Sequence, residues 1–273
     1  MFFVSKKQMT VACAEAGILG SMPSLNARTT EQFSADLAWI RACTDKPFGI
    51  DLAIGLTPNE LLEADSAACV EHEVPVLITS YGNPTDLAAR AHERGITVFH
   101  DVISPAHAKK AEAAGMDAII AGAGGHAGCI SPFVLYPWLD AELLVPIIAA
   151  GCITTTGQQL VASLSLGTQL CYIGTRFIAS TEYGAADAYE QKVVTSDPED
   201  IVYTDAVSGI HANFLEDTVP EGFTRDHSPD GAKRWRDIWS AGRGVGLIDS
   251  VQPIGRIVEG LVRDAQDTYG KLA

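Results

Sequence analysis

The sequence is short of positive charge. It has 19 lysine and arginine residues against 34 aspartate and glutamate residues, so its net charge is −15 at pH 7. Binding to nucleic acid needs clustered lysine and arginine that displace counterions from phosphates. An anionic membrane surface would repel so acidic a chain for the same reason. The composition therefore argues against nucleic acid and a lipid surface as partners.

Long apolar runs are also missing. None approaches the roughly 18 residues that a membrane helix needs. The first residues, MFFVSKKQMT, place apolar residues before charges, which is the reverse of a secretory signal peptide. We therefore expect no membrane span and a cytoplasmic location.

Paired cysteines are a third absence. The six cysteines contain no C-x-x-C pair and are scattered at Cys13, Cys43, Cys69, Cys129, Cys152 and Cys171. A zinc site or a disulfide framework shows a tighter spacing pattern. We therefore predict no metal site, a reducing compartment, and cysteines that act as small buried hydrophobic residues.

What the sequence does contain is a repeat of short apolar runs separated by amphipathic stretches. Eight runs have the composition of strands, at residues 2–4, 18–22, 48–54, 74–80, 97–102, 117–121, 145–151 and 170–177. Most are continuously apolar, as strands of a parallel sheet buried on both faces are. The stretches between them open with capping residues or proline and several end at glycine, as helices do.

This alternation predicts an α/β fold, a (β/α)8 TIM barrel with a short, clipped first strand and a C-terminal helical extension. A doubly wound open sheet would give the same alternation, but the count of eight strands favours closure. We place residues 1–273 in one barrel domain. Residues 181–235 would form an inserted, lid-like region, and residues 236–273 would form helices that pack on the barrel. Trp235 and Trp239, four residues apart, suggest one helical face.

Residues 121–128 read AGAGGHAG, four glycines and one histidine after an apolar run. Glycine lets a ligand approach the backbone closely, and barrel enzymes bind ligands at the carboxyl ends of their strands. Residues 122–127 also satisfy the dinucleotide-binding pattern G-x-G-x-x-G/A, which requires a helix to begin within it. Because Pro132 and Pro137 should interrupt any helix here, we favour a ligand loop with His126 as its chemical group.

Two further strand ends are rich in glycine and threonine. They read AAGCITTTGQQ at residues 149–159 and IGTRF at residues 173–177, after the last two predicted strands. Barrel enzymes frequently bind phosphate at this pair of loops through backbone N–H groups. Asp51 ends another strand, either as a ligand contact or as a cap for the following segment.

The remaining histidines are weaker candidates for chemistry. His100 ends the run TVFH and ranks second to His126. His72, His92 and His107 fall in helical stretches, which predicts surface positions. His211 follows the predicted barrel, where shaping a pocket is as plausible as catalysis.

These residues give the chain a resemblance to the nitronate monooxygenase family, also called 2-nitropropane dioxygenases, which are FMN-dependent TIM-barrel enzymes. The matching segments are PFGID at 47–51, AGGHAG at 123–128, GTRFIAS at 174–180, EDIVYTDAVSGIHANFL at 199–215 and IWSAGRGVGLID at 238–249. The resemblance covers essentially the whole chain. It implies a flavoprotein that oxidises alkyl nitronates or nitroalkanes with O2. For the oligomeric state, we keep a homodimer as one expectation.

The resemblance also implies roles for individual residues. His126 would be the catalytic base, since histidine has a pKa near neutrality. The FMN-binding residues would be Asp51, Gly124, Gly125, Ala150, Gly151, Cys152, Gly174, Thr175 and Ser240.

The chain departs from the family pattern at four points. Most of the first strand is missing, the loop before His126 is about three residues shorter, Asp51 replaces a usual Asn, and Cys152 replaces a usual Gly. These differences leave two alternatives to nitronate oxidation. One is an FMN- and NAD(P)H-dependent enoyl-thioester reductase, and the other is a degenerate barrel that binds a small molecule without turnover.

Overall fold

The centre of the molecule is one sheet of seven parallel strands, seen in a computed structural model that describes residues 1–273 apart from the side chain of residue 230. Each strand pairs in parallel with the next along the chain. The strands are β1 (Gly20–Pro23), β2 (Phe48–Ala53), β3 (Val76–Ser80), β4 (Thr97–Val102), β5 (Ala118–Gly122), β6 (Ile147–Ala150) and β7 (Leu170–Tyr172).

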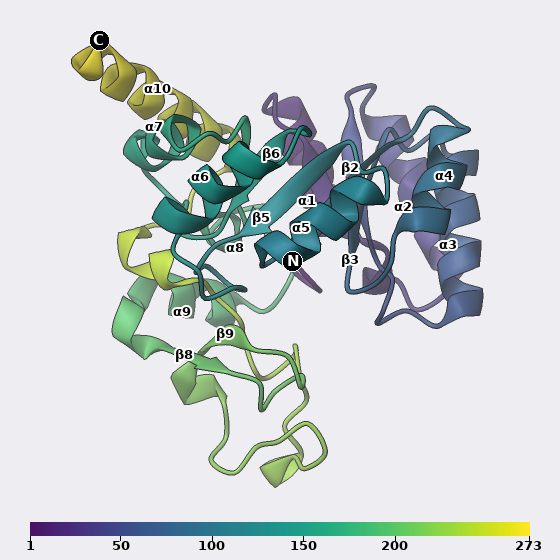
Figure 1. Cartoon of the computed structure of the whole chain (residues 1–273). Coiled ribbons are helices and arrows are strands. Elements are labelled where there is room, and N and C mark those ends of the chain that lie inside the picture. The colour runs from purple at the N-terminus through teal and green to yellow at the C-terminus, as the bar shows by residue number, and fades with distance from the viewer.

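Helices fill the connections and cover the outside of this sheet (Figure 1). They are α1 (Lys7–Glu15), α2 (Thr30–Cys43), α3 (Asn59–Glu71), α4 (Thr85–His92), α5 (Pro105–Ala113), α6 (Pro132–Glu142) and α7 (Gly157–Ser165). After β7 come α8 (Thr175–Ile178), α9 (Asp187–Thr195), an antiparallel pair of strands, β8 (Ile201–Thr204) and β9 (Ala212–Leu215), and finally α10 (Ile254–Leu272). Figure 1 shows α10 lying beside α7, whereas β8 and β9 extend from the other end of the barrel.

The sheet curves until its first and last strands approach each other. The Ser21 hydroxyl on β1 lies 3.1 Å from the Tyr172 hydroxyl on β7. No backbone ladder joins β1 to β7 within the chain that the structure describes. A side-chain hydrogen bond therefore spans the gap where a complete barrel would have another strand.

Alternation along the strands separates two cores. Ile78, Ile120 and Ile148 point into the barrel and pack near Tyr172. The residues between them, such as Leu77 and Ile119, face the helices. Because both faces of β2, β3, β5 and β6 are largely buried, these strands are mostly apolar, which is why their positions could be predicted from the sequence.

The strand predicted at residues 2–4 is wrong. These residues form a turn in which Phe3 has a φ of +59° and donates its N–H to the Asn26 side chain at 2.7 Å. Val4 is buried, but against α-helical residues rather than within a sheet. Phe2 is half-buried and Phe3 is 39% exposed, so only Val4 of this apolar run packs in a core, and the run has no neighbouring strand with which to pair.

Three local predictions also need correction. Pro132 and Pro137 do not prevent a helix, because α6 begins at Pro132 and contains Pro137, with Leu135 and Leu139 fully buried beneath it. The end of the strand predicted at residues 170–177 is instead helical, because α8 begins at Thr175. Trp235 and Trp239 do not share a helical face, since Trp235 has a φ of +66° and Trp239 stacks on Tyr189 at 5.1 Å.

The six cysteines are all free thiols. Among the described side chains, no group of three or more His, Cys, Asp or Glu is arranged to hold a metal ion. No described helix combines the length and the apolar character that crossing a membrane requires.

Candidate active site

The glycine-histidine loop follows β5 and packs directly against the loop after β6. Ala123 donates its N–H to the Ala150 carbonyl at 2.8 Å. A Cβ atom at Gly125 would lie 2.3 Å from the Cα of Gly151, so no other residue fits there without displacing backbone. At Gly125 the absence of a side chain therefore allows two loops of the chain itself to pack closely, whereas the sequence alone predicts that these glycines admit a ligand.

The loops after β6 and β7 present unpartnered backbone donors. Gly151 and Cys152 form a left-handed turn, with φ values of +96° and +57°. In the described chain, no hydrogen bond uses the N–H groups of Gly151, Cys152, Gly174 or Thr175. The two loops are neighbours because β6 pairs with β7.

This donor set fits a phosphate group. Phosphate oxygens accept hydrogen bonds from several backbone N–H groups that point to one place, and turns with left-handed residues provide such groups. The Cys152 side chain does not occupy this space, because its thiol turns away and donates to the Gly124 carbonyl at 3.1 Å. The side chain that replaces the family's glycine is therefore compatible with the turn.

His126 is held by the second strand of the β8–β9 pair. Its Nδ1 lies 3.2 Å from the Asn213 carbonyl oxygen, and its ring meets Phe214 edge to face at 6.1 Å between centroids. A carbonyl oxygen can only accept, so Nδ1 carries the proton and Nε2 has the free lone pair. The surrounding protein lowers the pKa of His126, and the hydrogen bond to Asn213 offsets this in part. The ring is therefore a neutral base near pH 7.

Two carboxyl groups point into the barrel at the same end. Asp51 on β2 accepts a long hydrogen bond from Ser80 at 3.4 Å, and burial raises its pKa to about 6. Asp101 on β4 has a pKa raised to about 7 by burial and by the charge of Asp51. Burial also raises the pKa of Tyr172 on β7, as do both carboxylates. Water still reaches Asp101 and His126, so these groups line an open end of the barrel.

The structure brings most of the predicted site residues together. Gly242, two residues after Ser240, donates its N–H to the Thr175 hydroxyl at 2.9 Å and lies against Gly125. Ser240 itself is reached by the hydroxyl of Tyr189, which donates to its carbonyl. Ser240 therefore lies at the edge of the loop cluster.

The other histidines do not join this cluster. His100 is buried on β4 and bonds to the Thr79 hydroxyl at 2.8 Å. His92 and His107 lie on exposed helix surfaces, and His72 is half-buried against Ser34. The exposed His211 lies 3.9 Å from Asp205.

Asn213 and Asp101 were missed at the sequence level. Asn213 was part of a segment that matched the family, but nothing local distinguished it. Asp101 could have been found, because a carboxylate near the end of an apolar strand is unusual for a residue that points into a barrel.

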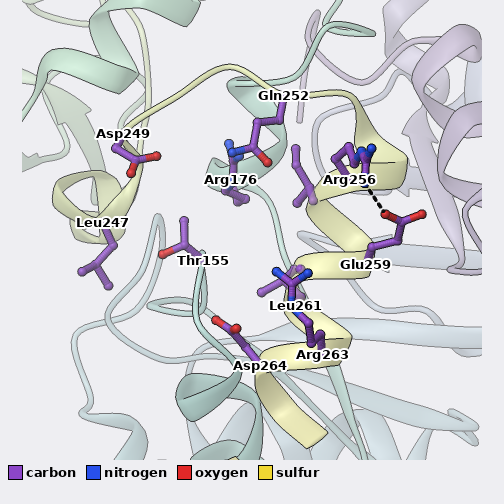
Figure 2. Close-up of a pocket in the computed structure, with 12 residues that line it drawn as sticks. Thr155, Arg176, Leu247, Asp249, Gln252, Arg256, Glu259, Leu261, Arg263 and Asp264 are labelled. Carbon is purple, nitrogen blue, oxygen red and sulfur yellow. Dashed lines mark hydrogen bonds and ion pairs between the residues drawn. The ribbon is translucent and has the colours of Figure 1, made fainter. Parts of the chain in front are cut away.

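A separate cavity of about 450 Å³ lies between α10 and residues that follow the β6 and β7 loops (Figure 2). Thr155, which follows the β6 loop, and Arg176, which follows Thr175, line it together with Asp249 and the first turns of α10. Arg176 is buried and donates to the Ala179 carbonyl at 3.0 Å. None of the predicted site residues lines this cavity.

Comparisons with known proteins agree with this architecture. A solved structure of FabK from Thermotoga maritima superposes with a TM-score of 0.87 at 29% identity, covering 100% of this chain and 92% of that one. It confirms the TIM-barrel fold class. A nitronate monooxygenase of Paraburkholderia phytofirmans is 29% identical over 84% of this chain and 75% of its own.

A third relative has a different named activity. A (3aS,4S,5R,7aS)-5-hydroxy-7a-methyl-1-oxo-octahydro-1H-indene-4-carboxyl-CoA dehydrogenase of Mycobacterium tuberculosis is 30% identical over 81% of this chain, but the match spans only 62% of the relative. The family model described as nitronate monooxygenase matches residues 1–232. The chain therefore belongs to the nitronate monooxygenase family of oxidoreductases.

Proposed function

We propose that this protein is an FMN-dependent oxidoreductase that oxidises small nitroalkanes or alkyl nitronates with molecular oxygen. The observation that supports this most is a neutral His126 beside two loops whose backbone donors lack acceptors. A base of near-neutral pKa and an anchored flavin are the two components that this oxidation needs.

On this proposal, the backbone N–H groups of Gly151, Cys152, Gly174 and Thr175 hold the FMN phosphate. Ala150, at the end of β6, would lie beside the phosphate with them, and Asp51, Gly124, Gly125 and Ser240 would contact the rest of the cofactor. FMN, when bound, supplies the redox chemistry by passing electrons from the substrate to oxygen.

His126 begins the reaction of a neutral nitroalkane. Its Nε2 removes the proton from the carbon next to the nitro group, and the electron pair of the C–H bond is delocalised into that group. The proton stays on Nε2, while Nδ1 keeps its hydrogen bond to Asn213. A preformed nitronate has already lost this proton, so its oxidation would not need the base.

Oxygen uptake by the FMN-loaded protein tests this proposal. We expect His126→Ala to retain FMN and to lose about 10²-fold or more of nitroalkane turnover. Nitronate turnover should fall far less. His107→Ala, an exposed histidine on α5, is the matched control and should behave like the unaltered protein. Equal nitroalkane turnover in the protein and in His126→Ala would contradict the role of this residue.

An NAD(P)H-dependent enoyl-thioester reductase is the second candidate. The similarity to a dehydrogenase named for a carboxyl-CoA substrate favours it. Consumption of NAD(P)H on addition of an enoyl-CoA, without oxygen uptake, would reveal this activity.

A further inference from the structure

Asn213 reaches the glycine-histidine loop from a part of the chain far from the barrel strands. It lies on β9, where it pairs with Tyr203 of β8, and only 3% of its surface is exposed. Its backbone N–H donates to the His126 carbonyl at 2.9 Å, and its own carbonyl oxygen lies 3.2 Å from Nδ1 of His126. Its side-chain Nδ2 donates to the Gly125 carbonyl.

These contacts hold the loop in place at Gly125 and His126. In the part of the chain that the structure describes, every hydrogen bond of Gly125 or His126 is made with Asn213. Gly124, with a φ of +66°, and Gly128, with a φ of +78°, flank this pair. Glycine-rich backbone has many accessible conformations, so the position of the imidazole depends on a partner outside the loop.

The chemistry of the partner also decides the state of the ring. Because the Asn213 carbonyl accepts, it selects the neutral form of His126 that is protonated on Nδ1. Nε2 is then the atom that can take a proton from a substrate. Without these contacts, the ring could rotate and either nitrogen could carry the proton.

We propose that Asn213 is a positioning residue that fixes His126 with Nδ1 protonated and Nε2 free to act as the base. Its side chain holds the loop through Gly125, and its backbone sets the tautomer. The role of Nε2 as a base rests on the proposed function. The protonation and orientation of the ring do not, since they can be measured without any substrate.

Nitrogen NMR of the histidine rings in the purified protein tests the tautomer directly. The His126→Ala spectrum identifies the His126 signals among the seven histidines. We expect a single tautomer with Nδ1 protonated. Asn213→Ala keeps the carbonyl that accepts from Nδ1 but loses the Nδ2 bond that holds the loop, so we expect the ring to leave that carbonyl and its signals to average over both tautomers. A His126 protonated on Nε2 in the unaltered protein would overturn the proposal, and so would an unchanged ring in a folded Asn213→Ala.

Turnover gives the second readout. Asn213→Ala should lower kcat for a neutral nitroalkane by about 10- to 100-fold, as loss of an orienting partner does, and should change KM and nitronate turnover little. Asn213→Asp keeps the size but removes the Nδ2 donor, so it should show the same loss if Asn213→Ala does not fold. Asn83→Ala, on an exposed loop, is the control. Equal losses on both substrates would overturn the positioning role.

The two proposals can fail separately. If the unaltered protein oxidises no nitroalkane but the ring signals respond to Asn213 as expected, only the proposed function fails. If nitroalkane is oxidised with His126 as the base but the ring is indifferent to Asn213, only this inference fails.

Discussion

The Nδ1 atom of His126 lies 3.2 Å from the carbonyl oxygen of Asn213, although 87 positions separate the two residues in the chain. This contact joins the loop after β5 to the strand pair that follows the barrel. It gives the predicted base a defined protonation and a fixed orientation, and the behaviour of the site with pH follows from it.

Nitroalkane turnover should depend on an unprotonated His126. Because enclosure by protein lowers the pKa of this ring, the acid limb of kcat/KM should have its midpoint below about 6.5, the ordinary histidine value. Activity should fall as the pH drops through that midpoint and reach a plateau above it. A pH profile for a neutral nitroalkane checks this, and an acid limb centred above pH 7 would contradict it.

Gly151→Ala should weaken FMN binding. Gly151 has a φ of +96°, and a Cβ there would lie 2.7 Å from the Gly125 nitrogen. Such strain costs about 1–3 kcal/mol, which would move the loop and raise the Kd for FMN about tenfold or more. Gly255→Ala, on α10 with open space around it, should leave the Kd unchanged. If fluorescence titration gave the same Kd for FMN in Gly151→Ala and in the unaltered protein, the backbone donors of this loop would not be part of the FMN site.

Asp51→Asn should stabilise the protein more at pH 8 than at pH 5. Burial raises the pKa of Asp51 to about 6, so the folded state holds this proton more tightly than the unfolded state does. The stabilisation from this group is present at low pH and is lost as the pH rises through 6. Since the side chain is only half-buried, we expect a modest gain in Tm of about 2–4 °C at pH 8.

The control for this change is Asp267→Asn, an exposed carboxylate on α10. It should shift the Tm by similar small amounts at both pH values. A larger gain for Asp51→Asn at pH 5 than at pH 8 would have the wrong sign and would contradict the raised pKa.

Tyr172→Phe should destabilise the fold slightly by removing the hydrogen bond between β7 and β1. The hydroxyls of Tyr172 and Ser21 are 3.1 Å apart and partly buried, so the loss should be about 1 kcal/mol. Urea unfolding measures it, with Tyr203→Phe on β8 as the control. An equal or smaller loss than in the control would show that this bond does not help to close the sheet.

Much of the fold could be predicted because its signals are local. The run FGIDLA is apolar on both faces and became β2, and Phe33, Leu37 and Ile40 formed the buried stripe of α2 as their spacing indicates. The run FFV at residues 2–4 is also apolar, yet it has no partner strand and turns at Phe3. An apolar run alone therefore does not make a strand, since a strand also needs a neighbour with which to pair.

The candidate site also has one part that local sequence signals predict and one part that they do not. The glycine pattern located the loop of His126 and the two loops beside it, because turns with positive φ need glycine locally. The partner of His126 could not be predicted, since Asn213 approaches through the packing of β9. The four-residue spacing of Trp235 and Trp239 is compatible with a helix, but spacing alone does not show what each side chain packs against. Trp239 stacks on Tyr189, and Trp235 has a positive φ that no α-helix contains.

The decisive measurement is the visible absorption spectrum of the purified protein, recorded before and after addition of FMN, with any released chromophore identified by mass. We expect one FMN per chain, bound on isolation or taken up on addition. A colourless protein that takes up no FMN would contradict it, and would leave a barrel that binds a small molecule without turnover as the better description.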